Sequence, residues 1–340
     1  MIYRSKAPLR IGLAGGGTDV SPYSDQFGGA ILNATVSLSA YATLEPIEED
    51  KIILRALDRN ESETHELLQR LPINGTLDLL KGVYNRIQRD YNFPLSGFIL
   101  STFVDAPAGS GLGTSSTLVV AILGVFVEKY KLPLSDYEIA QYAYSIERVD
   151  LQLAGGKQDQ YAATFGGVNF MEFYKDDKVI VNPLRIKPHY LHELENNLVL
   201  YFTATSRESA TIIKEQVKNV TNNNEKSIEA MHQLKEQAKM MKEALLQGKL
   251  NDIGEILDYG FQQKRLMAAN ISNQSIENIY DVAKASGATG GKISGAGGGG
   301  FMIFYCPNNT RYAVINALNN FGGAIKKYQF TKYGLTTWTV

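Results

Sequence analysis

Residues 107–116 are the part of this 340-residue chain whose composition most directly indicates chemistry. Glycines, serine and leucine come first, three hydroxyl residues follow, and the apolar run 118–127 then begins, long enough for a buried helix. Backbone N–H groups of such a loop, at the N-terminus of a helix, form a site for anions. N-capping explains one hydroxyl but not the glycines and serine before it. We therefore expect a phosphate-binding loop rather than a structural turn. Its members are Pro107, Gly109, Ser110, Gly111, Leu112, Gly113, Thr114, Ser115 and Ser116.

A second glycine-rich segment lies at residues 12–19, and Arg10 precedes it. Its glycines allow the backbone to approach a ligand closely and to adopt positive φ angles. The threonine and aspartate at its end add groups that suit sugar hydroxyls. A glycine turn with a hydrogen-bonded aspartate explains the segment equally well. The candidate sugar-binding residues here are Gly16, Gly17, Thr18 and Asp19.

A third glycine segment occupies residues 294–300, of which 295–300 match the G-x-G-x-x-G pattern of dinucleotide-binding proteins. That pattern needs a strand before it and a helix after it, whereas the strand-like residues 301–305 follow here. No Walker A sequence occurs anywhere in the chain. These observations leave a loop whose backbone packs at a contact between domains.

Two carboxylates between the second and third glycine segments are further candidates for chemistry. Ser135 and Glu138 form a capping box that starts a helix, which should end near Arg148 and carry Glu147. Asp159 lies in a short polar loop between this helix and a strand. From the pattern alone, a solvated loop aspartate explains Asp159 at least as well as a catalytic role does.

The elements that must position these groups differ between the two halves of the chain. The first half alternates short strands with helices, whereas the second half is mostly helical. A long amphipathic helix, with apolar residues from Ile228 to Leu245 at steps of three and four, should end at Gly248. Its stripe favours packing within the fold over a coiled-coil dimer, because no heptad continues. The predicted strands are 52–54, 97–100, 168–174, 197–204 and 301–305. The other predicted helices are 77–87, 118–127, 135–148, one from about residue 208 and two between 248 and 295.

Composition and charge exclude several classes of protein. Hydrophobic residues form 44% and charged residues 20% of the chain, so the composition is globular rather than disordered. A net charge of −1 gives no basic surface for nucleic acid. The single cysteine, Cys306, excludes an intrachain disulfide. No segment has the pattern of a signal peptide or of a membrane span, which needs roughly 18 apolar residues, so we expect a cytoplasmic protein without a membrane partner.

The length of the chain suits two domains rather than one. Pro183 and Pro188 punctuate a polar connection between the two halves. We therefore expect one domain at residues 1–188 and a second at 189–340.

Taken together, the three glycine segments resemble, in order and spacing, the motifs of the GHMP kinase superfamily. Residues 107–116 are similar to its P-x-x-x-G-L-G-S-S-A motif, from which Thr114 and Ser116 depart. Galactokinases carry Glu-His where this chain has Gly16 and Gly17, so the likeness does not extend to the usual galactose site. The resemblance implies an α+β fold, with an N-terminal α+β domain, a ferredoxin-like C-terminal domain and the active site between them.

The resemblance also implies roles for individual residues of an ATP-dependent kinase. Asp159 corresponds to the catalytic aspartate of the mevalonate kinase and galactokinase branches, and Arg10 to an arginine beside the transferred phosphoryl group. Ser115 and Glu147 correspond to ligands of Mg²⁺, and the loop at 107–116 would hold ATP phosphates. Gly297 and Gly298 would lie beside the substrate.

Within the superfamily, residues 10–19, 157–163 and 205–210 most resemble the D-glycero-D-manno-heptose 7-phosphate kinases. That likeness implies a sugar phosphate and ATP as small-molecule partners of a monomer or homodimer. Arg207 and Lys157 are then candidates to bind the sugar phosphate, because such a group needs fixed cations. A fucose kinase is the alternative substrate class. A diphosphate decarboxylase and a non-catalytic regulator share the fold, and intact Glu147 and Asp159 count against the regulator.

Overall fold

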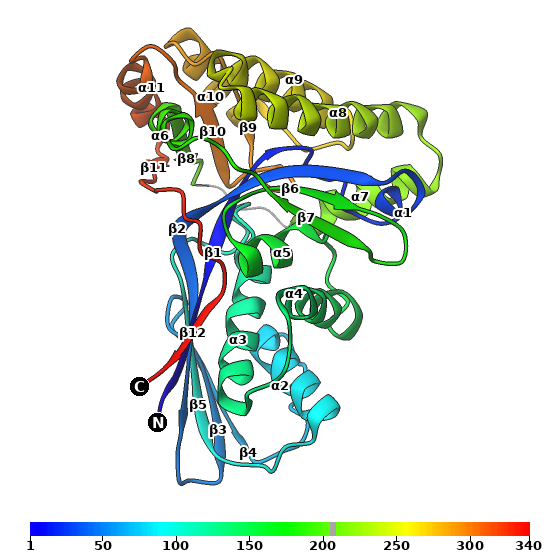
Figure 1. Ribbon diagram of the computed structural model, residues 1–340, viewed down its shortest axis with the longest axis vertical. Helices are drawn as coiled ribbons and strands as arrows, with labels where there is room; N and C mark the ends of the chain where they lie inside the picture. The colour runs from blue at the N-terminus through cyan, green and yellow to red at the C-terminus, as the bar shows by residue number, and fades with distance from the viewer. Residues whose placement is uncertain (205–208) are drawn as a thin grey trace.

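The computed structural model describes residues 1–204 and 209–340, which form two β-sheets joined by helices (Figure 1). The larger sheet has eight strands in the order β12-β1-β2-β5-β3-β4, while β6 pairs with β2 and β7 pairs with β6. All pairs are antiparallel except β3 with β5. Its strands are β1 (Tyr3–Ala14), β2 (Gly29–Pro46), β3 (Lys51–Ala56), β4 (Glu61–Glu66), β5 (Phe98–Val104), β6 (Val168–Phe173), β7 (Val179–Pro183) and β12 (Thr336–Thr339).

Strands β1 and β2 are long because each serves two regions of the molecule. The first part of β2 pairs with β6 and its last part pairs with β5, while β1 lies along both parts. A register shift between Pro8 and Arg10 marks the place where β1 changes direction. Both strands are buried over much of their length, and polar residues such as Arg10, Asn33 and Thr35 are buried among their apolar ones.

Helices of the first half lie on one face of this sheet (Figure 1). α3 runs through the core, and its residues are buried on nearly all sides. The predicted capping box of Ser135 and Glu138 is confirmed at the start of α4. This helix continues as a π-helical turn, η1, beyond the predicted end at Arg148. The elements are α1 (Tyr23–Phe27), α2 (Asp78–Tyr91), α3 (Thr114–Tyr130), α4 (Asp136–Ser145), η1 (Ile146–Asp150) and α5 (Gln158–Phe165).

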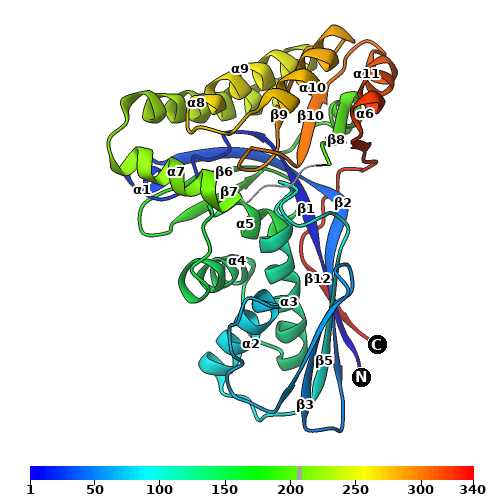
Figure 2. The same ribbon diagram turned by 180° about the vertical axis from the view of Figure 1, so that it is seen from behind.

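The second half builds a four-stranded antiparallel sheet in the order β11-β8-β10-β9. When the four strands are numbered as they occur along the chain, their order across the sheet is 4-1-3-2. Helices follow the first and the third of these strands, which confirms the ferredoxin-like topology. Figure 2 shows α8 and α9 lying over the junction of the two sheets. The elements are α6 (Pro188–Asn197), β8 (Leu198–Phe202), α7 (Ser209–Thr221), α8 (Glu225–Gln247), η2 (Leu250–Asp252), α9 (Ile253–Arg265), α10 (Gln274–Ala285), β9 (Gly290–Ile293), β10 (Phe301–Tyr305), α11 (Arg311–Leu318), η3 (Asn319–Phe321) and β11 (Ala324–Ile325).

The apolar stripe of α8 is buried within the chain, as predicted. Met231 and Leu234 join the core beneath β9 and β10, whereas Met241 and Leu245 join the core that includes β1 and β2. One helix therefore fastens the two halves together, and its apolar face is not available for a coiled coil.

The last strand of the chain, β12, returns from the second half to the sheet of the first half. β12 pairs with β1, and both chain termini lie at that edge of the large sheet (Figure 1). The proposed division at residue 188 therefore leaves out one connection, because residues 336–339 belong to the sheet of the first half. Nothing in the local sequence of a short terminal strand identifies its partner. Among the residues described, no helix combines the length and apolar character needed to cross a bilayer.

The predicted backbone packing of the third glycine segment is confirmed. A Cβ atom on Gly295 would lie 2.6 Å from the Cα atom of Gly111, and one on Gly300 would lie 2.4 Å from the carbonyl oxygen of Ser110. The amide of Phe301 donates to that same Ser110 oxygen at 2.8 Å. Glycine is required at these contacts because two backbones approach closer than any side chain allows.

We expect Gly111→Ala to destabilise the protein strongly, because Gly111 has a φ of 84° and an added Cβ would lie 2.4 Å from the Ser294 carbonyl oxygen. Gly75→Ala is the matched control, since Gly75 has a φ of 94° but no atom within 4 Å of an added Cβ. The control should lose about 1–2 kcal/mol from backbone strain alone. Gly111→Ala should lose roughly 1–3 kcal/mol more, measured by urea unfolding. Equal losses would contradict the close contact.

Candidate active site

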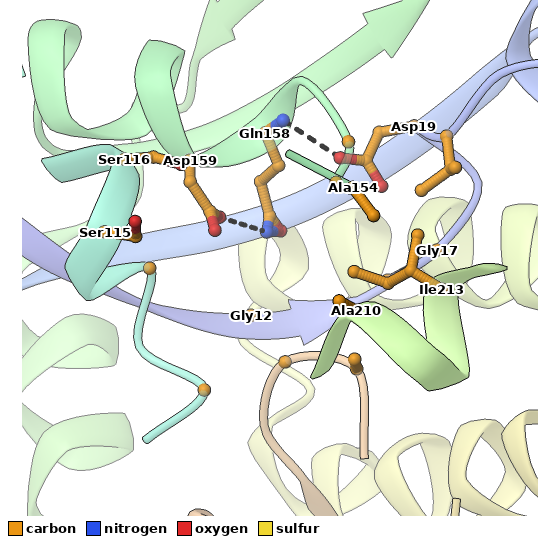
Figure 3. A pocket seen from close by; sticks show the side chains of 18 of the residues that line it. Gly12, Gly17, Asp19, Ser115, Ser116, Ala154, Gln158, Asp159, Ala210 and Ile213 are labelled. Atoms are coloured by element: carbon orange, nitrogen blue, oxygen red, sulfur yellow. Dashed lines mark hydrogen bonds between the residues drawn. The ribbon is translucent and has the colours of Figure 1, made fainter. Parts of the chain in front are cut away.

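A cavity of about 710 Å³ lies between the two halves. Figure 3 shows Ser115 and Asp159 on one side of it, with Asp19, Ala210 and Ile213 on the other. Its lining comes from all three glycine segments, from residues 147–159, from α7, and from two lysines of the second half. The segments that the sequence marked as chemical therefore converge on one space.

The predicted phosphate loop forms the floor of one end of this cavity. Gly109, Gly111 and Gly113 have φ angles of 70°, 84° and 78°, which turn the backbone into the N-terminus of α3. This arrangement is suited to an anion, because the first N–H groups of a helix have no partner within it. The loop residues that line the cavity are Gly109, Gly111, Gly113, Thr114, Ser115 and Ser116.

Three members of the predicted loop have other positions. Leu112 is fully buried in the core, and Ser110 is also buried, its backbone oxygen bound to the third glycine segment. Pro107 is exposed and is not part of the cavity lining. Leu112 anchors the loop in the apolar core, and the three residues shape the turn that exposes the glycines to the cavity.

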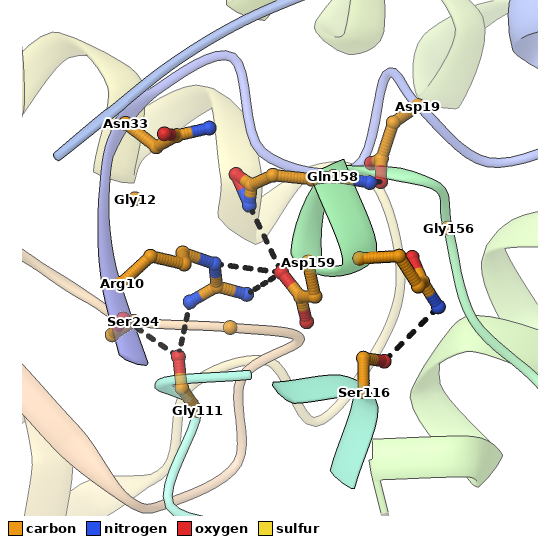
Figure 4. A network of polar contacts seen from close by, with 12 residues as sticks. Arg10, Gly12, Asp19, Asn33, Gly111, Ser116, Gly156, Gln158, Asp159 and Ser294 are labelled. Carbon is orange, nitrogen blue, oxygen red and sulfur yellow. Dashed lines mark hydrogen bonds and ion pairs between the residues drawn. The ribbon is translucent and has the colours of Figure 1, made fainter. Parts of the chain in front are cut away.

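Arg10 and Asp159 form an ion pair at the centre of the cavity (Figure 4). The Nη2 and Nε atoms of Arg10 lie 2.6 and 2.7 Å from Oδ1 of Asp159. Nη1 of Arg10 donates to the Gly111 carbonyl at 2.6 Å, which ties the arginine to the phosphate loop. An added Cβ on Gly113 would lie 3.0 Å from the Asp159 carboxyl carbon, so that glycine also makes room for the aspartate. The pair predicted from the resemblance is thus assembled beside the loop.

Glu147 lies at the bottom of the cavity, 1% exposed. Its Oε2 accepts a hydrogen bond from Nε2 of Gln160, which also donates to the Ser116 hydroxyl at 3.1 Å. Burial raises the pKa of the Glu147 carboxyl, and Arg148, 3.8 Å away, offsets part of that effect. A buried carboxylate with a raised pKa gains stability from a nearby cation. The exposed hydroxyl of Ser115 lines the same space and can supply a second oxygen.

Asp19 lines the opposite end of the cavity, and its contact with a sugar stays a prediction. Its Oδ2 accepts the Gln158 amide at 2.9 Å, at the start of α5, and this fixes the carboxylate. Gly16 and Gly17 also line the cavity. Thr18 is different, because its fully buried hydroxyl bonds to the Gly15 and Ala30 carbonyls inside the loop. The expectation that Thr18 contacts the sugar is corrected to a structural role.

Lys157 does not face the cavity, contrary to expectation. Its ammonium group lies 2.9 Å from Asp177 and 3.4 Å from Asp25, and the residue is 1% exposed. Burial by itself lowers the pKa of Lys157, but the pairing with Asp177 and its neighbours raises it above the usual value. Its charge is neutralised within the fold, so it is not available to a sugar phosphate. Arg207 lies outside the described residues, so its role stays a prediction.

Gly297 and Gly298 are also absent from the cavity lining. The Gly298 amide donates to the Ile271 carbonyl at 2.8 Å, and an added Cβ on Gly297 would lie 2.9 Å from that oxygen. Both are buried. They pack the third glycine segment against the turn after α9, and Gly295 and Ala296 line the cavity instead.

Sequence reasoning missed Lys264 and Lys292, both of which line the cavity. Lys264 follows Ile253, Leu257 and Phe261 at helical steps on the buried face of α9, so the period itself marks it as an inward-facing charge. Lys292 interrupts the buried strand β9 directly before the third glycine segment. A lysine at an apolar position of a periodic pattern is the signal that could have identified both.

Comparison with known proteins agrees with this geometry. Residues 78–167 match the family described as GHMP kinases N terminal domain, and residues 241–324 match GHMP kinases C terminal. The D-glycero-alpha-D-manno-heptose 7-phosphate kinase of Campylobacter jejuni is 47% identical over 337 residues, covering 99% of each chain. The L-fucokinase/L-fucose-1-P guanylyltransferase of Bacteroides fragilis is 28% identical over 87% of this chain and 34% of its own length.

Solved structures show the same relationship. The crystal structure of a D-glycero-D-manno-heptose 1-phosphate kinase from Bacteroides thetaiotaomicron has a TM-score of 0.86 and 46% identity, and the match covers 99% of both chains. A Lactococcus lactis galactokinase complexed with galactose has a TM-score of 0.78 at 19% identity, over 98% of this chain and 95% of that one, which is a likeness of fold. With a glycine-rich loop at a helix N-terminus, a buried carboxylate and an arginine–aspartate pair around one cavity, this chain belongs to the GHMP kinase family and is a phosphotransferase.

Proposed function

We propose that this protein is an ATP-dependent sugar kinase that phosphorylates the anomeric hydroxyl of D-glycero-D-manno-heptose 7-phosphate, giving the 1,7-bisphosphate. The Arg10–Asp159 pair carries the proposal, because it lies between the phosphate loop and the end of the cavity formed by Asp19. The 47% identity with the Campylobacter heptose 7-phosphate kinase supports this acceptor. A 1-phosphate acceptor is the second candidate, supported by the name of the Bacteroides structure. Fucose is the third, supported by the 28% identical fucokinase.

In this proposal the reaction depends on positioning and charge. N–H groups of the loop and of the α3 N-terminus hold the nucleotide phosphates. Asp159 accepts the proton of the sugar hydroxyl as that oxygen attacks the γ-phosphorus, and the bond to ADP breaks. Arg10 orients Asp159 and stabilises negative charge on the transferred group. Asp19 orients the sugar by accepting hydrogen bonds from its hydroxyls.

Ser115 and Glu147 would hold Mg²⁺. The residues fit this ion, because Mg²⁺ keeps several waters and needs only one or two carboxylates beside the phosphates. No group of three or more His, Cys, Asp or Glu side chains occurs in the part of the chain that the structure describes, which is compatible with such a sparse site. When bound, the ion would neutralise charge on the β- and γ-phosphates.

An ADP-release assay with a panel of acceptors tests the proposed function. The heptose 7-phosphate should give the highest kcat/KM, and heptose 1-phosphate, unphosphorylated heptose, fucose and mevalonate diphosphate should give rates at least about 10-fold lower. ³¹P NMR of the product should show a new phosphate on the anomeric carbon. A preference for fucose or for the 1-phosphate would replace the proposed acceptor with that one.

Asp159→Asn should lower kcat by about 10²–10⁴-fold, because the amide accepts no proton, while the Kd of ATP changes little. Asp176→Asn is a matched control: Asp176 is exposed, lies outside the cavity lining, and has a φ of 58° that asparagine tolerates well. A variant at position 159 within a few-fold of wild-type kcat would exclude the role as base.

Ser115→Ala and Glu147→Gln should each raise the Mg²⁺ concentration needed for half-maximal rate by roughly 10-fold or more, because each removes an oxygen ligand. Ser110→Ala is the control within the same loop, since Ser110 is buried and does not line the cavity. Curves of rate against Mg²⁺ that superimpose for all four proteins would show that the ion is held elsewhere.

A further inference from the structure

Two buried lysines remain unexplained by the proposed mechanism. Lys264 and Lys292 are 2% and 4% exposed, yet both line the cavity. Each ammonium group makes one hydrogen bond to a backbone oxygen: Lys264 to Gly295 at 2.6 Å and Lys292 to Gly12 at 3.0 Å. No carboxylate within residues 1–204 or 209–340 lies within ion-pair distance of either one. An ammonium group has three donors, so both have unused capacity.

The two lysines lie close to each other and to a third cation. A Cβ atom on Gly16 would lie 3.6 Å from Nζ of Lys264 and 4.0 Å from Nζ of Lys292. Both ammonium groups therefore lie beside one short stretch of the glycine segment at residues 12–19. Arg10 is close enough to affect both electrostatically. Asp159 accepts hydrogen bonds from the guanidinium of Arg10, and Asp19 is close enough to Lys264 to act on it electrostatically. Three cations thus share a space with two carboxylates.

This arrangement is costly without an anion. Burial and, to a lesser extent, the charge of Arg10 lower the pKa of Lys264 to about 8, against the opposing effect of Asp19. Burial also lowers the pKa of Lys292 well below its usual value, with Lys264 and Arg10 acting in the same direction. Buried like charges without partners destabilise a fold, and such a cluster is retained where a ligand neutralises it.

The location of the cluster restricts the ligand. Lys264 bonds to Gly295, whose backbone touches Gly111 of the phosphate loop, whereas Lys292 bonds to Gly12 at the end of β1. The cluster therefore lies beside Gly16, in the segment that also carries Asp19, at the end of the cavity that the proposed function assigns to the acceptor. The ammonium groups of Lys264 on α9 and Lys292 on β9 converge on one space. A compact dianion with several oxygens can accept hydrogen bonds from both.

We propose that Lys264 and Lys292, together with Arg10, form a binding site for the dianion of a phosphate monoester on the acceptor side of Asp159. The proposal rests on the proposed function for its two sources of such a group. One source is the phosphate that the acceptor sugar already carries, and the other is the phosphoryl group in transit from ATP. A purely structural role, in which each lysine only secures a glycine loop through its carbonyl oxygen, is the competing explanation.

Thermal unfolding with inorganic phosphate separates binding from structure and needs no kinase activity. The measurement is made with saturating ADP, so that the nucleotide loop is filled, and with chloride at equal ionic strength as reference. Phosphate should raise the Tm of the wild type. Lys264→Met and Lys292→Met should have a Tm in chloride equal to or above that of the wild type, and should lose most of the increase caused by phosphate. Lys264→Arg should retain it.

Lys284→Met is the matched control. Lys284 also donates to a backbone carbonyl, that of Thr289 at 2.7 Å, but it is exposed and does not line the cavity. This variant should keep the full response to phosphate. The proposal is overturned if phosphate leaves the Tm of the wild type unchanged, or if the methionine variants unfold at lower temperature but keep the response. If a methionine variant does not fold, the effect of phosphate on the Tm of the wild type and of Lys264→Arg still tests the proposal.

Steady-state kinetics then distinguish the two sources. If the site holds the acceptor's own phosphate, Lys264→Met should raise KM for the phosphorylated sugar about 10- to 100-fold and leave that for the free sugar unchanged. If it holds the transferred group, kcat should fall by a similar factor with either sugar. Unchanged kinetic constants with both sugars would overturn the proposal. A wild type that binds phosphate through these lysines but phosphorylates no sugar would refute the proposed function and leave the site intact.

Discussion

The backbones of Gly111 and Gly295 touch at the junction of the two halves, and the active site depends on this contact. The Gly111 carbonyl accepts hydrogen bonds from Arg10 of β1 and from Ser294 at the end of β9. Both halves are thereby connected to one peptide group of the phosphate loop. A side chain at either glycine would separate the loops, and the arginine, the aspartate and the lysines would no longer surround one cavity.

Charge is distributed unevenly along the cavity. The buried carboxylate of Glu147 lines the cavity together with the glycine loop before α3, Asp159 is paired with Arg10, and Asp19 lines the part formed by the segment at residues 12–19. Lys264 and Lys292 approach from the second half, where no carboxylate among the described residues pairs with them. Phosphoryl transfer requires fixed charges around the moving group, and a water-poor site makes each of them stronger. Under the proposed function, these charges would hold a cation near Glu147 and an anion near Asp159.

The relatives described above are named for sugar substrates and differ in whether that sugar carries a phosphate. Two proteins at 46–47% identity bear names that agree on a heptose phosphate and differ on which carbon carries its phosphate. In the proposed reaction the sugar presents one hydroxyl to Asp159, so the position of a phosphate already on the sugar would set the orientation in which it binds. The fucokinase and the galactokinase are more distant, at 28% and 19% identity, and the galactokinase structure shares the fold.

Much of the architecture was accessible from the sequence because its causes are local. Helical periodicity predicted α2 and α8, a long apolar run predicted α3, and the capping box predicted where α4 begins. The order and spacing of the three glycine segments led to the loop before α3 and to the carboxylates of Glu147 and Asp159, all of which line the cavity. The resemblance to the GHMP kinases added the topology, since pattern alone does not specify how strands pair.

Long-range packing decided the remainder. Lys157 is two residues from Asp159 in the chain, yet its side chain turns away to pair with Asp177. Lys264 is more than a hundred residues from Asp159, and it lines the same cavity. Likewise, β12 returned to a sheet built by the first half. Sequence therefore determined which elements and loops form, because backbone preference and periodicity act over a few residues. Only the tertiary structure determined which charges share a cavity, because that depends on how distant elements pack and on which face of each element is buried.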